Sequence, residues 1–417
     1  MDPLRRAQLP GLARLAAAGQ IDTGFASLAT FVIQVYAVRA FSADELGVFS
    51  LAFAAFVAAS LVPTVSVFNP YEILAVGAER SVRMAVLHHS MSRGAALGLV
   101  SGALVAAGSL PLAGSVQDSF VIAVGVSGWA AAGASALQDH VRRLAHLSGR
   151  SWIAAGMSGV LLVGVSAVTV VPTGLASDWV PFGALAAANV ISTAVGLAAS
   201  RYWTMDGSIY SSARISRMGS WLLVEGVGGS VWSYTSAALL GAITSSAVLG
   251  WVEGARVVAR PVMVSAQGLL AVVGPRSMEA AFTHDGKLAR TWRKRYGMAL
   301  VIIAGLFSLG LAIPGSAGLL ADLLPNAFEV RHLALVTGLA FAVQASVLPM
   351  QAELQALRRQ KALAGTTLLA GAAQVAATVS AVRIGGFSSP LSIVAVTAVR
   401  FSLFRTVLRA SYRRTPV

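Results

Sequence analysis

Residues 39–50 read RAFSADELGVFS, and this polar stretch decides the fold. It separates two apolar runs, 20–38 and 47–68, each about long enough to cross a bilayer as a helix. A tight turn between two such runs predicts a helical hairpin in lipid. The pattern returns in residues 239–253, where Leu249-Gly250 takes the place of Leu46-Gly47 at an offset of 203 residues. Because this offset is close to half of the 417 residues, it predicts a duplicated unit, as many transporters have.

The composition is that of a membrane protein. Apolar residues make up 56% of the chain and charged residues 12%, and the mean hydropathy is +0.74. Cysteine is absent, which excludes disulfides and thiolate chemistry. The net charge of +14 would suggest a nucleic-acid partner in a soluble chain. Here the basic residues lie in short connections between apolar runs, so we predict membrane topology as their role and no nucleic-acid partner.

The charge distribution predicts the number and orientation of the helices. We predict about twelve transmembrane helices, at residues 19–38, 47–68, 88–110, 119–137, 152–172, 180–199, 218–240, 247–273, 297–314, 331–350, 362–382 and 388–408. Alternate connections then hold 25 basic residues on one side and only Arg39, Arg331 and Arg383 on the other. Positively charged connections stay in the cytoplasm, which predicts that both termini are cytoplasmic.

Six helices in each half return the chain to its starting side, so the halves would be parallel repeats. We predict an N-terminal six-helix lobe at 1–200, a cytoplasmic linker between lobes at 201–217, and a C-terminal six-helix lobe at 218–417. The fold class is therefore all-α and integral to the membrane.

Signals of catalysis are missing from the sequence. There is no phosphate-binding loop and no nucleophile elbow, and the longest outer connection, about 315–330, is too short for a catalytic domain. We therefore expect no enzyme activity, no catalytic residue, no cofactor and no metal. The histidines fall in or beside predicted loops and are interpreted as interfacial polar residues: His88, His89, His140, His146, His284 and His332.

Charges at membrane depth are costly, so they are candidate site residues. Glu253, Arg256 and Arg260 share one face of the eighth predicted helix at i, i+3 and i+7. Glu253 and Arg256 can also simply neutralise each other. Arg256 and Arg260 are the main candidates for binding a diphosphate, because the planar guanidinium makes two hydrogen bonds and stays charged. Pro261, directly after Arg260, favours a kink.

Three further charges complete the candidate set. Glu225 precedes a glycine-rich stretch of the seventh helix and is a cation site or an arginine partner, or only part of a close helix contact. Asp22, near the start of the first helix, is a site residue or a favourable charge for the helix dipole. Arg39, at the outer end of that helix, is a site residue or an interfacial cation. Arg400 is interpreted as part of a basic stripe that meets anionic lipid.

Four stretches together resemble the polysaccharide-biosynthesis membrane proteins. They are AVRAFSADELGVFSLAFA at 37–54, LQDHVRRLAHLSGRSW at 137–152, LLGAITSSAVLGWVEGARVVARPV at 239–262 and LQALRRQKAL at 354–363. These flippases of O-antigen and other lipid-linked oligosaccharides belong to the superfamily of multidrug, oligosaccharidyl-lipid and polysaccharide exporters. The resemblance implies a V-shaped, MATE-like pair of six-helix bundles around a central cavity. It also implies a polyprenyl-diphosphate-linked oligosaccharide as substrate.

The sequence therefore predicts a flippase in the plasma (inner) membrane of a bacterium. Its expected partners are the lipid-linked sugar and membrane lipids, with a polysaccharide polymerase or glycosyltransferases as candidate protein partners. Two alternatives stay open: a cation-coupled small-molecule exporter of the multidrug type on the same fold, and a non-transporting scaffold for polysaccharide enzymes.

Overall fold

The computed structural model describes residues 3–70, 80–147, 150–170, 176–200, 212–313 and 331–413, and these are built from helices joined by short turns. In chain order the elements are α1 (Pro3–Ala40), α2 (Ala43–Pro63), η1 (Thr64–Phe68), α4 (Arg80–Gly108), η2 (Leu110–Ser115), α5 (Asp118–Leu147), α6 (Ser151–Val170), η3 (Ser177–Trp179), α7 (Val180–Ser200), α8 (Ser212–Ile243), α9 (Ser246–Phe282), α10 (Gly286–Ala312), α12 (Arg331–Ala345), α13 (Leu348–Ala356), α14 (Gln360–Ser380), η4 (Val382–Phe387) and α15 (Ser388–Arg413).

The predicted all-helical membrane fold is confirmed. Within the described ranges, 10 helices are long and apolar enough to cross a membrane. An eleventh span results if the two parts of α9, Ser246–Leu270 and Val273–Phe282, count as one despite a 44° bend. The predicted seventh span lies in α8. Some side chains of this helix are outside the described part of the structure. The cytoplasmic location of the termini stays a prediction.

Several helices extend beyond the predicted spans, among them α9 and α10. Helix α9 continues to Phe282, and its bend lies beyond Pro261, where the sequence predicted a kink. Helix α10 begins at Gly286, where the Asp285 carboxylate accepts hydrogen bonds from the backbone N–H groups of Lys287 and Leu288. Lysine and arginine are good helix formers, so helix α10 can begin in the basic sequence that precedes its apolar run.

The chain forms two compact units. Unit 1 contains Met1–Ala37, Ala55–Leu110 and Asp118–Leu223, and unit 2 contains Val38–Ala54, Pro111–Gln117 and Val224–Val417. The turn of the first hairpin is thus grouped with the second half of the chain. The lobes predicted at 1–200 and 218–417, with a linker at 201–217, stay a prediction, and residues 201–211 of that linker lie outside the described ranges.

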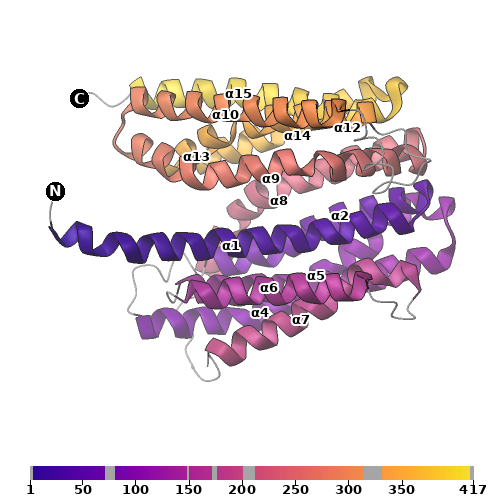
Figure 1. The fold of residues 1–417 in the computed structure, drawn as a ribbon, viewed down its shortest axis with the longest axis horizontal. Helices are drawn as coiled ribbons and strands as arrows, with labels where there is room; N and C mark the ends of the chain where they lie inside the picture. Colours follow the sequence, from indigo (N-terminus) through magenta and orange to yellow (C-terminus); the bar gives the residue numbers. More distant parts are fainter. Residues whose placement is uncertain are drawn as a thin grey trace. The chain divides into compact units, whose positions relative to one another are not determined.

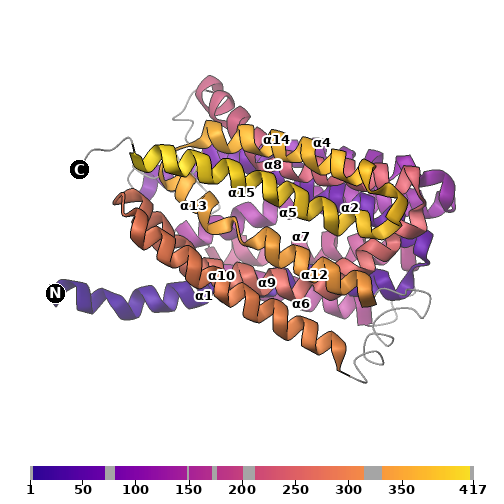
Figure 2. The same cartoon turned by 90° about the horizontal axis from the view of Figure 1, so that it is seen from above.

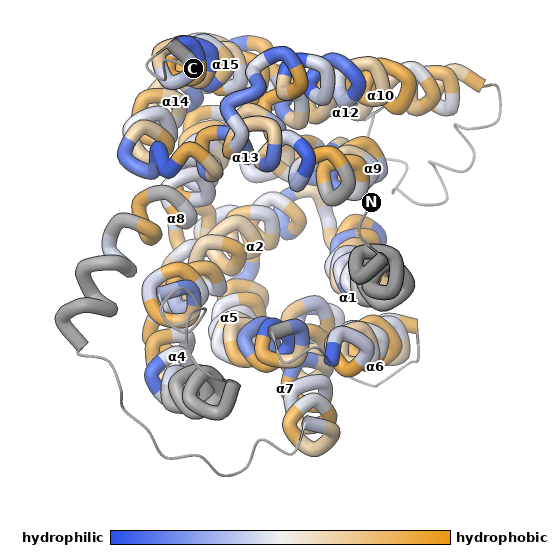
Figure 3. Tube along the Cα trace, turned by 90° about the vertical axis from the view of Figure 1, so that its left-hand side faces the viewer, coloured by the Kyte–Doolittle hydropathy of each residue, from blue (hydrophilic) through white to orange (hydrophobic). Residues whose placement is uncertain are grey.

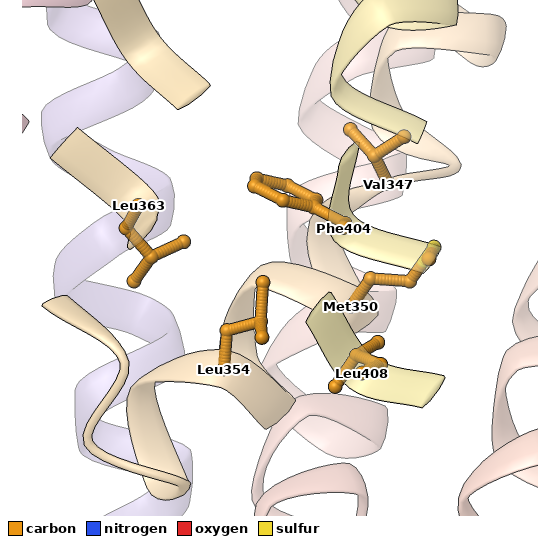
Figure 4. Close-up of a cluster of buried hydrophobic side chains, with 6 residues drawn as sticks. All are labelled: Val347, Met350, Leu354, Leu363, Phe404 and Leu408. Atoms are coloured by element: carbon orange, nitrogen blue, oxygen red, sulfur yellow. The ribbon is translucent and has the colours of Figure 1, made fainter. Parts of the chain in front are cut away.

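Each unit is a bundle of neighbouring helices. In unit 1, α5 packs against α4, α6 and α7 (Figure 1). In unit 2, α9 packs against α10, α12 and α13, and α14 packs against α15 (Figure 2). Buried side chains of α13, α14 and α15, with one residue directly before α13, form one apolar cluster of unit 2 (Figure 4): Val347, Met350, Leu354, Leu363, Phe404 and Leu408.

One histidine prediction is wrong. His140 is not interfacial but fully buried in α5, where its ring stacks on Phe68 with 3.7 Å between the centroids. Its Nε2 lies 2.9 Å from the Ser90 hydroxyl of α4. The close packing of α4 on α5 buries this position, and a buried polar ring needs such a partner.

Candidate functional site

The two Leu-Gly pairs found in the sequence lie in one contact of unit 2. A Cβ atom at Gly47 would overlap the backbone carbonyl of Ser246, and a Cβ atom at Gly250 would overlap the carbonyl of Ala43. Ala43 and Ser246 have the same 203-residue offset as the two glycines. The contact is therefore reciprocal, with each glycine packed on the start of the other helix. Glycine is needed at both positions because only hydrogen fits between the backbones.

Two side-chain hydrogen bonds accompany this backbone contact. The Ser246 hydroxyl donates a hydrogen bond to the Asp44 carboxylate. The Ser50 hydroxyl donates to Glu253 Oε2 at 3.1 Å, and these two residues are again 203 positions apart. The sequence analysis missed Ser50, although its offset from Glu253 could have revealed it.

The structure shows the pairing of Glu253 with Arg256 that the sequence left open as an alternative. Glu253 is 5% exposed, and its Oε2 lies 3.7 Å from Arg256 Nη1. The other terminal nitrogen, Arg256 Nη2, donates to the Ser389 hydroxyl of α15 at 3.2 Å. One carboxylate therefore interacts with both a hydroxyl and a guanidinium, which satisfies its charge in a buried position.

Two more arginines of unit 2 are half-buried. Arg260 follows Arg256 by just over one turn of α9. Arg400 lies on α15, and a Cβ atom at Gly229 of α8 would be 3.6 Å from its Nη2, so the glycine leaves room for this guanidinium. Arg400 thus packs beside α8. Its interpretation as part of a lipid-facing basic stripe did not include this helix neighbour. Helix α15 has no acidic residue, and Ser246–Leu270 of α9 has Glu253 alone.

Asp22 belongs to its own network in unit 1. It lies far inside α1, so its interpretation as a helix-dipole charge is wrong. Its carboxylate accepts from the Ser158 hydroxyl at 2.6 Å, lies 2.9 Å from His146 Nε2, and pairs with Arg142 at 3.5 Å. Arg142 also pairs with Asp139 at 2.6 Å. Asp22 is only 3% exposed, and cationic groups of α5 compensate its charge.

Two predicted site residues remain, Arg39 and Glu225. Arg39 is exposed at the end of α1. Glu225 lies on α8, but its side chain is outside the described part of the structure. The structure therefore brings together Glu253, Arg256 and the neighbouring Arg260.

A third buried acid, Glu353, was missed by the sequence analysis. Glu353 of α13 is 0% exposed, and its Oε2 accepts from the Tyr412 hydroxyl at 3.2 Å. Its Oε1 lies 3.4 Å from Arg293 Nε, an ion pair whose alignment is too poor for a hydrogen bond. Glu353 falls outside the predicted spans, so sequence reasoning gave no cause to single it out.

Comparison with known proteins shows the fold to be that of the MATE transporters. Over 94% of this chain and 96% of the other, it is similar to the inward-facing structure of a multidrug resistance MATE family transporter of the MOP superfamily, with a TM-score of 0.73 and 13% identity. It is also similar to a point mutant of the Vibrio cholerae MATE transporter VcmN, with a TM-score of 0.63 and 15% identity over 97% of this chain and all of the other. A third similar structure is a MOP superfamily transporter from Pyrococcus furiosus, with a TM-score of 0.60 and 15% identity over 97% of this chain and 96% of the other.

No protein-family profile and no curated protein sequence matches the chain. At 13–15% identity the structural likeness establishes the architecture. The chain is therefore a multi-pass membrane protein with the MATE fold.

Proposed function

We propose that this protein is a transporter that flips a polyprenyl-diphosphate-linked oligosaccharide across the bacterial plasma membrane by alternating access, for export of cell-surface polysaccharide. The observation that supports this substrate is the set of three half-buried arginines on α9 and α15 of unit 2, Arg256, Arg260 and Arg400, with little acidic charge on those helices. Charged groups at this depth are costly and are kept where they act on a substrate.

The chemistry of the arginines suits a diphosphate. A guanidinium has five N–H donors, and those that Arg256 uses for Glu253 and Ser389 leave others for phosphate oxygens. Glu253 and Ser389 would hold Arg256 in place before the substrate arrives. The sugar requires a polar path because its hydroxyl groups cannot enter hydrocarbon without hydrogen-bond partners.

The reciprocal glycine contact suits the conformational change. Alternating access requires contacts that form in one state and break in the other. At the Gly47–Gly250 contact two helix starts approach with few side chains between them, and two polar links accompany it, Asp44–Ser246 and Ser50–Glu253. Separation of the helices would free Glu253 from Ser50 and thereby change the surroundings of Arg256.

A cation-coupled small-molecule exporter is the second candidate. The resemblance to a multidrug resistance transporter and the buried acid Asp22 favour it. In unit 1, however, Arg142 and His146 already interact with Asp22, which reduces its ability to attract a further cation. The Pyrococcus furiosus structure is described as having a binding pocket of reverse polarity that suggests a different function. By analogy, we use the charge of the candidate site to choose between an anionic and a cationic substrate.

The test measures the leaflet that exposes lipid-linked sugar in cells lacking the protein. Complementing chains would be the parent, the double variant Arg256→Gln, Arg260→Gln, and the single variant Arg400→Gln. Arg409→Gln is the matched control, because Arg409 is an exposed arginine of the same helix α15. Hydrogen bonds to charged groups contribute about 1.5–3 kcal/mol, so each lost arginine should slow flipping roughly 10- to 100-fold.

We expect sugar-lipid to accumulate in the cytoplasmic leaflet unless the parent or the control is present. If the distribution is unchanged on deletion while cationic dyes accumulate in the cells, the exporter function replaces the flippase. If flipping continues but polymerase or glycosyltransferase recruitment is lost, the scaffold function replaces it.

A further inference from the structure

Trp292 of α10 carries two guanidinium groups on one indole ring. The central carbon of Arg276, from α9, lies 4.7 Å from the ring centroid, and that of Arg295 lies 5.0 Å from it. Trp292 is half-buried and packs against an apolar cluster that includes Val273 and Tyr296, so the ring is a fixed platform. The negative face of the indole attracts each of these cations.

Two like charges on one ring repel each other, and their surroundings add to the positive potential. Both arginine residues are exposed, and no ion pair between described residues includes them. Three more exposed cations follow the first turns of α10: Lys287, Arg290 and Lys294. Of the two acids in residues 276–295, Glu279 is exposed and Asp285 caps the helix. An anion between Arg276 and Arg295 would relieve the repulsion.

An apolar surface lies beside these cations and favours a lipid over a soluble anion as the ligand. Arg295 stands at one end of a stripe on α10 that continues at i+3, i+7, i+11 and i+14 with Met298, Ile302, Leu306 and Leu309, each 62–64% exposed. Figure 3 shows hydrophobic residues along α10. In a membrane-spanning helix such a stripe lies against acyl chains, and the cations at its end then lie at headgroup level.

We infer that Arg276, Trp292 and Arg295 form a binding site for the phosphate headgroup of an anionic glycerophospholipid, whose acyl chains lie along the exposed stripe of α10. The guanidinium groups would bind the phosphate oxygens, and the indole would hold both cations in position. The site lies at the helix ends that the charge distribution places in the cytoplasm, where the leaflet carries anionic lipid. It is independent of the transported substrate.

The experiment is native mass spectrometry of the purified full chain during titration with phosphatidylglycerol or phosphatidylethanolamine. The double variant Arg276→Gln, Arg295→Gln removes both ring-bound cations. The matched control, Arg290→Gln, Lys294→Gln, removes the same charge from exposed residues of α10 that no cation–ring contact includes. We expect the parent and the control to bind the first phosphatidylglycerol at least tenfold more tightly than phosphatidylethanolamine, and the double variant to lose this preference.

Three results would overturn the inference. The parent could bind both lipids equally, or the control could lose the preference as fully as the double variant, which would indicate a diffuse charge effect. Inorganic phosphate could also displace the lipid at millimolar concentration, which would indicate a site for a soluble anion. If the glutamine variant does not fold, as judged by gel filtration, Arg276→Lys, Arg295→Lys keeps the charge, and weaker binding by this variant supports the two-pronged contact.

Discussion

Replacing Gly250 with alanine tests the reciprocal helix contact most directly. The added Cβ atom would overlap the backbone carbonyl of Ala43, and a main-chain atom cannot rotate away as a side chain can. The two helix starts must therefore separate, and overpacking of this kind costs about 1–3 kcal/mol of folding free energy. Exchange of glycine for alanine within a helix otherwise raises the free energy of unfolding by roughly 0.5–1 kcal/mol, so the expected net loss is about 0–2.5 kcal/mol, and the loss relative to an unhindered glycine-to-alanine exchange is about 1–3 kcal/mol.

Reciprocity makes a second, sharper prediction for the double variant. Gly47→Ala alone should cost a similar amount, because its Cβ atom would overlap the carbonyl of Ser246. Once one alanine has separated the backbones, the other finds space already open. We therefore expect Gly47→Ala, Gly250→Ala to cost less than the sum of the single variants by at least about 0.5 kcal/mol.

The assay is unfolding of the purified chain in mixed micelles by titration with sodium dodecyl sulfate, followed by tryptophan fluorescence. Gly305→Ala is the control, because it is also a helical glycine but a Cβ atom there meets nothing within 4 Å. It should leave stability unchanged or raise it by up to about 1 kcal/mol. Single variants as stable as the control, or strictly additive costs in the double variant, would refute the reciprocal contact.

Two more variants test the buried acids by the same unfolding assay. Asp22→Asn should lower the free energy of unfolding by about 1–3 kcal/mol, because it weakens charged contacts to Arg142 and His146; unchanged stability would contradict the network of unit 1. Tyr412→Phe should also cost about 1–3 kcal/mol, since it removes the hydroxyl that donates to the buried Glu353 carboxylate. A phenylalanine variant as stable as the parent would show that this carboxylate does not need the hydrogen bond.

Apolar run length was sufficient to predict the fold class. Lipid offers no partner for backbone N–H and C=O groups, so long apolar segments must be helices whatever their detailed packing. The 203-residue offset singled out Gly47 and Gly250, which the structure places in one reciprocal contact. Spacing on one helix was enough to predict the Glu253–Arg256 pair, because residues three apart are neighbours on a helix surface.

Helix ends and side-chain partners were decided only by the tertiary structure. Hydropathy reports where lipid can surround a helix, and it does not register the basic extension of α10 that brings Trp292 to Arg276. The partners of Asp22 come from α5 and α6, more than a hundred residues away, so no local pattern could connect them. The sequence by itself determined which segments are helices in the membrane, and only the packing of those helices decided which charges meet.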